Sequence, residues 1–176
     1  MRPTRSSTRL VFFGGLLGLL LGGTACAVRS GPITSQVLDA QTNQPIAGAV
    51  VLGVWTTKGE GIFGAHAPTK LVGVQEVETD AEGRFTLARP GMVAEDDEKI
   101  TVYKFGYVAW SNLYTFPSFK RRPETDVPAQ IRLEYFPPGG NHREHMRSIS
   151  LGIAAGVYDE MNPKFQKAID HELRMR

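Results

Sequence analysis

The sequence contains only one cysteine, Cys26, among its 176 residues. A single thiol cannot form an internal disulfide, and it cannot build a zinc site that depends on several thiolate ligands. The chain also lacks a Gly-x-Ser-x-Gly motif, a phosphate-binding loop and a dinucleotide-binding fingerprint. We therefore expect no catalytic residues and no cofactor, and these absences favour a binding or structural protein over an enzyme.

The first 25 residues have the composition of an export signal. Three arginines precede the apolar run at residues 10–21, which is too short to span a bilayer comfortably, and small residues then lead to Cys26. This arrangement resembles the lipobox of bacterial lipoproteins, in which the cysteine is acylated and becomes the new N-terminus. Gly23 stands where that family prefers leucine. Ordinary signal cleavage near Ala25 or Ala27, with Cys26 left as a free thiol, is the alternative.

Acylation of Cys26 would make membrane lipid the first partner, since several acyl chains on one residue anchor a protein stably. Ala27 resembles the residue that permits transfer to the outer membrane in Gram-negative lipoproteins. We therefore expect an envelope lipoprotein in the outer membrane, facing the periplasm, with residues 26–32 as a tether. A soluble periplasmic or secreted protein follows from the alternative cleavage.

Positive and negative side chains are nearly equal in number, with 20 Lys+Arg against 18 Asp+Glu. Removal of residues 1–25 takes away three arginines and no acidic residue, which leaves 17 basic and 18 acidic side chains and a net charge of −1. The nearest basic cluster, residues 120–122, is interpreted as a solvated loop. Because nucleic-acid binding usually needs a concentrated basic surface, we expect no nucleic-acid partner.

The clearest structural signal follows the tether. Residues 33–38 alternate between two faces with a period of two, which favours a half-buried strand. Asp39 opens a polar run, Pro45 and Gly48 favour a turn, and residues 49–55 form a strand-like apolar run. This pattern predicts a hairpin-like corner of an antiparallel sheet.

Two further signals follow at regular spacing. Asp80 and Gly83 mark a tight turn between strand-like stretches, because aspartate accepts hydrogen bonds from nearby amides and glycine tolerates a left-handed backbone. A strand then begins at Ile100 and ends in Gly106 and Tyr107.

Together these signals resemble the carboxypeptidase regulatory-like domain, a transthyretin-like (prealbumin-like) antiparallel β-sandwich. The resemblance implies a mainly β fold over residues 33–136 and a folding or binding module without catalytic residues of its own. It leaves residues 137–176 as a helical extension, and the glycine-rich insert at 56–69 departs from the compact pattern. The resembling residues are Val37, Asp39, Thr42, Pro45, Ile46, Gly48, Ala49, Val51, Thr79, Asp80, Gly83, Phe85, Ile100, Val102, Gly106 and Tyr107.

Two regions are candidates for a ligand or partner surface. The insert at residues 56–69 reads as a long loop, and such loops are often functional. The aromatic stretch at 107–116 reads as a strand or strand pair with one aromatic face. The insert could instead tuck over one end of the sandwich, and the aromatic face could instead pack into the core. The candidate residues are Ile62, Phe63 and His66 in the insert, and Trp110 and Tyr114, accompanied by Phe116, on the aromatic face.

Metal sites are weakly supported. Residues 95–98 carry four neighbouring carboxylates, but without the spacing of an EF-hand loop we interpret them as a solvated loop. His142 and His145 are spaced to share a metal on a helix, yet zinc needs three or four ligands. A segment beginning at His171 starts like the HExxH helix of metalloproteases, but Met175 replaces the second histidine. We therefore predict no metal site.

The C-terminal segment changes to a helical period. Asn141 is a candidate cap for a helix with the apolar stripe Met146, Ile149, Ile153 and Val157, and Pro163 begins a second helix with Phe165, Ile169 and Leu173. Such stripes usually dock on the parent domain, although they could bind a partner.

The sequence as a whole predicts a non-enzymatic, lipid-anchored binding or scaffolding module of the bacterial envelope, with an envelope protein or glycan as the partner. A soluble module that binds a sugar or peptide is the second hypothesis, and a metal-dependent hydrolase is the third.

Overall fold

The structure is a computed structural model, and it describes residues 28–58, 69–91, 93–94, 97–151, 153, 157 and 161–175. Eleven strands and two helices lie in this part of the chain: β1 (Val28–Arg29), β2 (Ile33–Asp39), β3 (Val50–Lys58), β4 (Thr69–Glu78), β5 (Arg84–Leu87), β6 (Val93–Ala94), β7 (Glu98–Tyr103), β8 (Trp110–Ser111), β9 (Tyr114–Thr115), β10 (Lys120–Arg121), β11 (Gln130–Leu133), α1 (His142–Leu151) and α2 (Pro163–Leu173).

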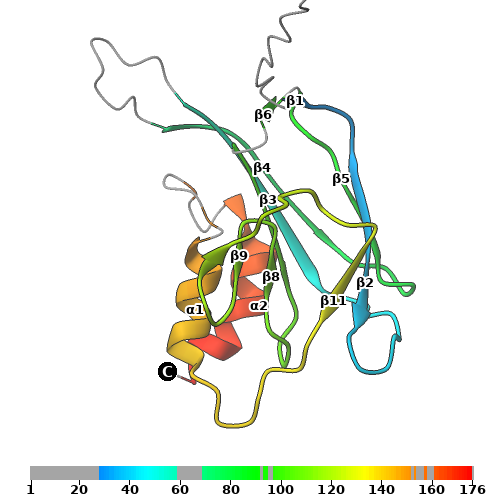
Figure 1. The fold of residues 1–176 in the computed structure, drawn as a ribbon, viewed down its shortest axis with the longest axis vertical. Coiled ribbons are helices and arrows are strands. Elements are labelled where there is room, and N and C mark those ends of the chain that lie inside the picture. The colour runs from blue at the N-terminus through cyan, green and yellow to red at the C-terminus, as the bar shows by residue number, and fades with distance from the viewer. Residues whose placement is uncertain are drawn as a thin grey trace, which may run out of the picture.

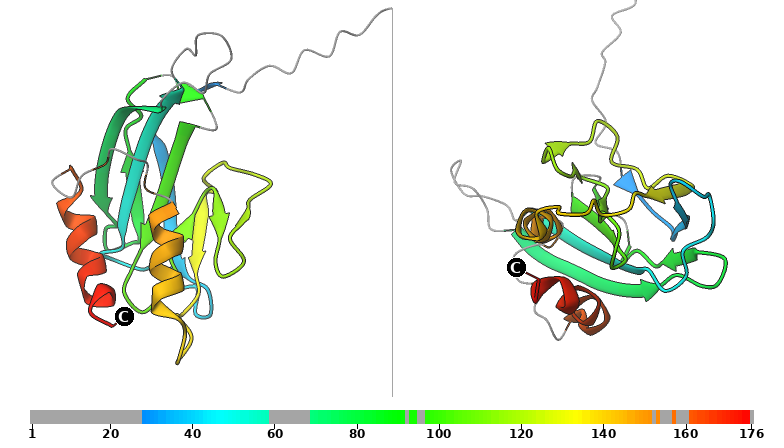
Figure 2. Two further views of the ribbon diagram at one scale, coloured as in Figure 1. Left: turned by 90° about the vertical axis from the view of Figure 1, so that its left-hand side faces the viewer. Right: turned by 90° about the horizontal axis from the view of Figure 1, so that it is seen from below.

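The elements form three layers (Figures 1 and 2). A four-stranded sheet in the order β4-β3-β7-β8 lies between a three-stranded sheet, β11-β2-β5, and the two helices. This arrangement confirms the predicted mainly β, sandwich-like fold with a helical C-terminal extension. The sheets are not wholly antiparallel, because β11 pairs with β2 in parallel.

Strand β3 explains the apolar run at residues 49–55, because both of its faces are buried. Val50, Leu52 and Val54 face the helices, whereas Val51 and Trp55 face the three-stranded sheet. A strand covered on both sides has no solvent face to keep polar, so its sequence becomes continuously apolar.

The predicted hairpin at the start of the domain is a corner between the two sheets instead. β2 belongs to the three-stranded sheet and β3 to the four-stranded sheet, and only the isolated bridge between Leu38 and Pro45 links the two arms of the turn. Asp39 Oδ1 accepts hydrogen bonds from the backbone amides of Gln41 and Thr42, both at 2.8 Å. The bond from Thr42 is the main reason that the pKa of Asp39 falls to about 2.

A second corner joins β4 to β5 and requires glycine at position 83. Gly83 has φ of +71°, and a Cβ atom there would lie 2.4 Å from the carbonyl oxygen of Val37. The same residue accepts a hydrogen bond from Val37 N at 2.7 Å, which ties the corner to β2. Asp80 Oδ1 closes the turn by accepting from the amides of Glu82 and Arg84.

Three segment boundaries differ from expectation. β3 continues to Lys58 and β4 begins at Thr69, so residues 56–58, expected in a long loop, belong to a strand. β7 ends at Tyr103, before Gly106, which has φ of +87° in the turn that follows. Residues 28–29, expected as part of a tether, pair with β6 as strand β1.

Both helices dock on the four-stranded sheet. Asn141 Oδ1 accepts a hydrogen bond from Glu144 N at 3.1 Å, as expected of a cap, and α1 ends at Leu151, short of Ile153. Pro163 begins α2, whose first amides, of Lys164 and Phe165, donate to the carboxylate of Glu76 on β4. Apolar side chains of both helices fill a second core against the sheet, namely Met146, Ile149, Phe165 and Ile169.

Candidate ligand-binding site

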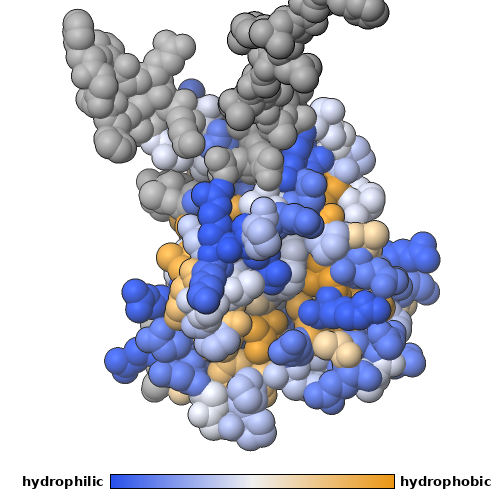
Figure 3. Space-filling view, in the orientation of Figure 1, coloured by the Kyte–Doolittle hydropathy of each residue, from blue (hydrophilic) through white to orange (hydrophobic). Residues whose placement is uncertain are grey.

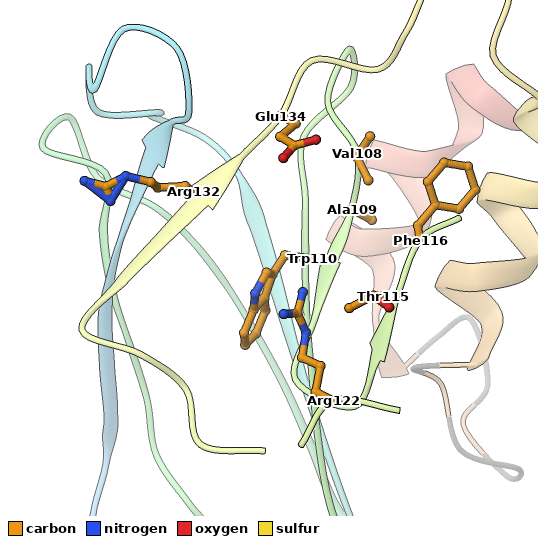
Figure 4. Close-up of a pocket in the computed structure, with 8 residues that line it drawn as sticks. All are labelled: Val108, Ala109, Trp110, Thr115, Phe116, Arg122, Arg132 and Glu134. Atoms are coloured by element: carbon orange, nitrogen blue, oxygen red, sulfur yellow. The ribbon is translucent and has the colours of Figure 1, made fainter. Parts of the chain in front are cut away.

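The sandwich is closed along one side and open along the other. On the closed side, Gln75 on β4 accepts a hydrogen bond from the amide of Ala88, just after β5, at 2.6 Å. On the opposite side, β8 and β11 are the edge strands of their sheets. A cleft of about 210 Å³ lies between them, lined by Val108, Ala109, Trp110, Thr115, Phe116, Arg122, Arg132 and Glu134 (Figure 4).

A short backbone ladder closes one end of this cleft. Tyr107 and Tyr135 form an antiparallel bridge, flanked by hydrogen bonds from Val108 N to Glu134 O and from Phe136 N to Gly106 O, both at 2.8 Å. The rings of Tyr107 and Tyr135 stack with centroids 4.6 Å apart. The two sheets are therefore joined at this end, and the cleft begins where the ladder stops.

Trp110 and Arg122 form the centre of the cleft. The Arg122 guanidinium carbon lies 5.4 Å from the centroid of the Trp110 ring, within the range of a cation–π interaction. Its Nε donates to the carbonyl oxygen of Ser111 at 2.7 Å, which fixes the plane of the guanidinium. Figure 4 shows this group beside the indole ring, facing the cleft.

The terminal nitrogens of Arg122 are the free donors of the site. Within the described part of the chain, they have no hydrogen-bond partner and the guanidinium has no ion pair. Burial lowers the pKa of Arg122, yet a guanidinium stays charged at any ordinary pH. A fixed planar cation with free parallel N–H groups is suited to bind a carboxylate or another oxyanion with two hydrogen bonds.

The surroundings of this cation are mixed. Glu134 lies at the closed end of the cleft, and Figure 4 shows Arg132 on β11 pointing away from Trp110. A second hollow of about 400 Å³ shares Trp110 and Arg122 with the first and continues past Pro123 and Pro128. In the space-filling view, hydrophobic surface lies at the centre of this face, with hydrophilic residues around it (Figure 3).

The structure places only part of the predicted surface at this cleft. Trp110 is half-buried: it packs against the sandwich core and also lines the cleft. Phe116 also lines the cleft, whereas Tyr114 does not. Four other predicted residues, Cys26, Ile62, Phe63 and His66, lie outside the described residues.

Arg122 was missed because its basic triplet reads as a solvated loop. Lys120 and Arg121 are indeed exposed in β10, but Arg122 turns inward and is only partly exposed. No local pattern connects it with Trp110, twelve positions earlier. The available signal was a basic cluster close to an aromatic strand.

The interpretation of residues 95–98 as a solvated loop is wrong for its last member. Glu98 begins β7 and is 0% exposed. Its carboxylate accepts hydrogen bonds from Trp55 Nε1 at 3.0 Å and from Arg89 Nη2 at 3.0 Å, and it pairs with Arg29 at 3.3 Å. The Glu98 carboxylate therefore links β1 to the core through hydrogen bonds and an ion pair, and it is occupied by these structural contacts.

The two histidines considered as metal ligands belong to a buried hydrogen-bond cluster. Glu172 on α2 is 3% exposed, and its Oε1 lies 2.9 Å from Nδ1 of His142 and 2.6 Å from Nδ1 of His145. Tyr103 donates its hydroxyl to the other carboxylate oxygen at 2.8 Å. Burial would raise the pKa of Glu172, but the hydrogen bonds, chiefly from His145 and His142, outweigh it and lower the pKa.

The tautomer of His145 follows from its second nitrogen. The backbone amide of Ala109 donates to Nε2 at 2.8 Å, so Nε2 carries no proton and Nδ1 donates to Glu172. Both ring nitrogens are therefore occupied by hydrogen bonds, and the cluster fastens α1 and α2 to the sheet. Within the described residues, no group of three or more His, Cys, Asp or Glu side chains is placed so that it could hold a metal ion.

None of the helices in the described part of the chain combines the length and apolar character needed to cross a bilayer. The chain matches no protein-family model, no curated protein and no solved structure.

Proposed function

We propose that this protein is a non-enzymatic binding module of the bacterial envelope that holds a carboxylate-bearing ligand in the cleft between β8 and β11. One observation carries the proposal, namely the guanidinium of Arg122, fixed on Trp110 with its terminal nitrogens free. The indole face adds a flat apolar surface against which a sugar ring or a peptide side chain can lie.

The arrangement favours binding over catalysis because its parts are suited to hold a charge and not to move a proton. An arginine does not give up its proton in a protein. Among the described residues, no histidine lines the cleft, and both ring nitrogens of the buried His145 are occupied by hydrogen bonds with Ala109 and Glu172. A metal-dependent hydrolase is not supported by these contacts.

A pair of ligands that differ only in the carboxylate tests this proposal. D-glucuronate and D-glucose share one ring, and we expect glucuronate alone to produce a saturable change in tryptophan emission. Trp110 is the reporter, because Trp55 is 1% exposed. The dissociation constant should lie in about the millimolar range for a single ionic contact.

Arg122→Gln should weaken glucuronate binding by about tenfold or more, since hydrogen bonds to a charged group are worth about 1.5–3 kcal/mol. Arg121→Gln, next to it on the exposed strand β10, is the matched control and should leave binding unchanged. Equal responses to the two sugars, or an unchanged affinity in Arg122→Gln, would refute the proposal.

The proposed anchor is acylated Cys26, and the support for it is the export-type leader. The contacts of β1 determine how far the proposed anchor can lie from the folded domain. Arg29, three positions after Cys26, pairs with Glu98 and with Asp126, and Arg89 donates to the carbonyl oxygens of Ser30 and Gly31. Three residue steps span at most about 11 Å, so an acylated Cys26 would hold the module against the membrane surface.

The intact mass of the protein purified from membranes tests the anchor. We expect a lipid mass on the wild-type chain and release of Cys26→Ala into the soluble fraction. A soluble wild-type protein without a lipid mass would instead identify a secreted or periplasmic module. The resemblance to carboxypeptidase regulatory-like domains stays part of this proposal, supported by the two turn aspartates and by the need for glycine at position 83.

A further inference from the structure

We propose that the ligand is an extended peptide that binds as an additional strand along the free edge of β11 and places a carboxylate on Arg122. This inference rests on the proposed function, because it identifies the class of ligand that the same cleft would accept. Addition of a strand to an exposed sheet edge is a general mode of peptide recognition, in which backbone hydrogen bonds supply much of the affinity.

The hydrogen bonds of β11 show which of its backbone groups are free. Gln36 N donates to Ala129 O at 3.1 Å, and Ala40 N donates to Leu133 O at 2.9 Å. In a parallel pair with this register, the odd-numbered residues of β11 bond to β2. The backbone N–H and C=O groups of Gln130 and Arg132 therefore point away from β2, towards the cleft.

The chain itself already uses the next position along this edge. Glu134 has the same parity as Gln130 and Arg132, and its carbonyl oxygen accepts the amide of Val108. The 106–108 segment thus forms the first rung of an antiparallel ladder on this edge. The chain then leaves this edge to pair as β8 with β7, and the positions beside Arg132 and Gln130 have no strand partner among the described residues. An added strand would continue an existing ladder.

The edge on the other side of the sandwich is partly protected. There β4 and β5 are the edge strands, but the side chain of Gln75 covers the amide of Ala88, and Pro90 packs against Gly73 on β4. Proline and side-chain cover are common ways of protecting a sheet edge. Among the described residues, no such hydrogen bond covers the outward backbone groups of Gln130 and Arg132 on β11.

Arg122 favours a peptide that carries a carboxylate. The positive groups that line the cleft are Arg122 and Arg132, and the acidic Glu124 and Asp126 line the adjoining hollow, where Asp126 pairs with Arg29. Glu134 lies at the closed end, where the existing ladder occupies the edge. A carboxylate on the incoming strand would therefore meet Arg122 midway along the cleft and avoid Glu134.

Hydrogen exchange of individual amides tests the strand directly. The probe is an acetylated and amidated pentapeptide with a central glutamate between valines and threonines, and the control peptide has glutamine instead. We expect the acidic peptide to slow exchange of the Gln130 and Arg132 amides. The amides of Ile131 and Leu133, already bonded to β2, should change little. Binding of the peptide without protection at 130 and 132 would overturn the inference.

A matched pair of variants isolates one backbone donor. Arg132→Ala and Arg132→Pro both lose the side chain, but only the proline variant loses the N–H that faces the cleft, and proline is tolerated on edge strands. Peptide affinity should be about fivefold weaker in Arg132→Pro than in Arg132→Ala, as expected for one hydrogen bond. Equal affinities in the two variants, with both folded, would count against an added strand.

The outcomes separate this inference from the proposed function. If glucuronate and the acidic peptide both require Arg122 but neither protects Gln130 and Arg132, the cleft binds carboxylates without a strand and only the inference fails. If neither ligand responds to Arg122→Gln, the proposed function itself fails.

Discussion

Replacement of Glu98 by glutamine should cost this protein a large part of its stability. The Glu98 carboxylate is fully buried and accepts hydrogen bonds from Trp55 and Arg89 while it pairs with Arg29. Glutamine has nearly the same shape, but it removes the negative charge and turns an N–H₂ group towards the side chains that donated to the carboxylate. Two arginines would remain partly buried with no opposing charge at this position.

The expected loss is about 3–5 kcal/mol, the range found when one partner of a buried ion pair is removed. This is a large fraction of the 5–15 kcal/mol that typically separates folded from unfolded domains. Urea unfolding at pH 7, followed by far-UV circular dichroism, measures the difference. Glu82→Gln is the control, because its side chain lies on the exposed turn between β4 and β5 and should shift the free energy by less than about 0.5 kcal/mol.

The pH dependence of this difference provides a second test. Burial alone would raise the pKa of Glu98, but hydrogen bonds from Arg89 and Trp55 outweigh it and lower the pKa below its ordinary value of 4.5. A lowered pKa means that the stabilisation is fully present above about pH 4.5 and is lost as the pH falls through the folded-state value. The gap between wild type and Glu98→Gln should therefore shrink below pH 4.5. A gap below 1 kcal/mol at pH 7 would refute the reasoning.

Two further substitutions test the packing. Gly83→Ala should destabilise the protein by about 2–3 kcal/mol, because a Cβ atom at this position would clash with the carbonyl oxygen of Val37. Gly139 has a similar φ of +74° but open space around it, so Gly139→Ala should cost only about 1 kcal/mol. Equal losses of stability in urea unfolding would contradict the close approach at Gly83. Thr101→Val should stabilise the protein by about 1 kcal/mol in the same assay, because the buried Thr101 hydroxyl has no hydrogen-bond partner within the described residues. A loss of stability in this variant would show that the hydroxyl does have a partner.

The layered fold was largely predictable because its signals are local. Alternation in β5 and β11 and the polar turns at Asp39 and Asp80 are short-range patterns, and the structure shows inward Phe85, Ile131 and Leu133 as the alternation predicts. Which strands pair with each other was harder to predict from the sequence. A turn between two strands looks the same whether they pair with each other or enter different sheets, which is why the corner at Asp39 was predicted as a hairpin.

The candidate site was only half predictable for the same reason. Trp110 belongs to an evident aromatic stretch, but its partner Arg122 lies in a basic triplet whose other members are exposed. Glu98 likewise sits in an acidic run that looks solvated, and its burial depends on Arg89, nine positions earlier, and on Arg29, 69 positions earlier. Contacts of this kind come from the topology and leave no local pattern.

The most direct test of the central claim is collisional quenching of Trp110 by iodide and by neutral acrylamide, compared between wild type and Arg122→Gln at constant ionic strength. Trp55 is too deeply buried to contribute, so the quenching constants report the cleft. A cleft that attracts anions through Arg122 predicts that the iodide constant falls at least twofold in the variant while the acrylamide constant changes little. Equal iodide quenching in both proteins would show that Arg122 does not bring anions to Trp110.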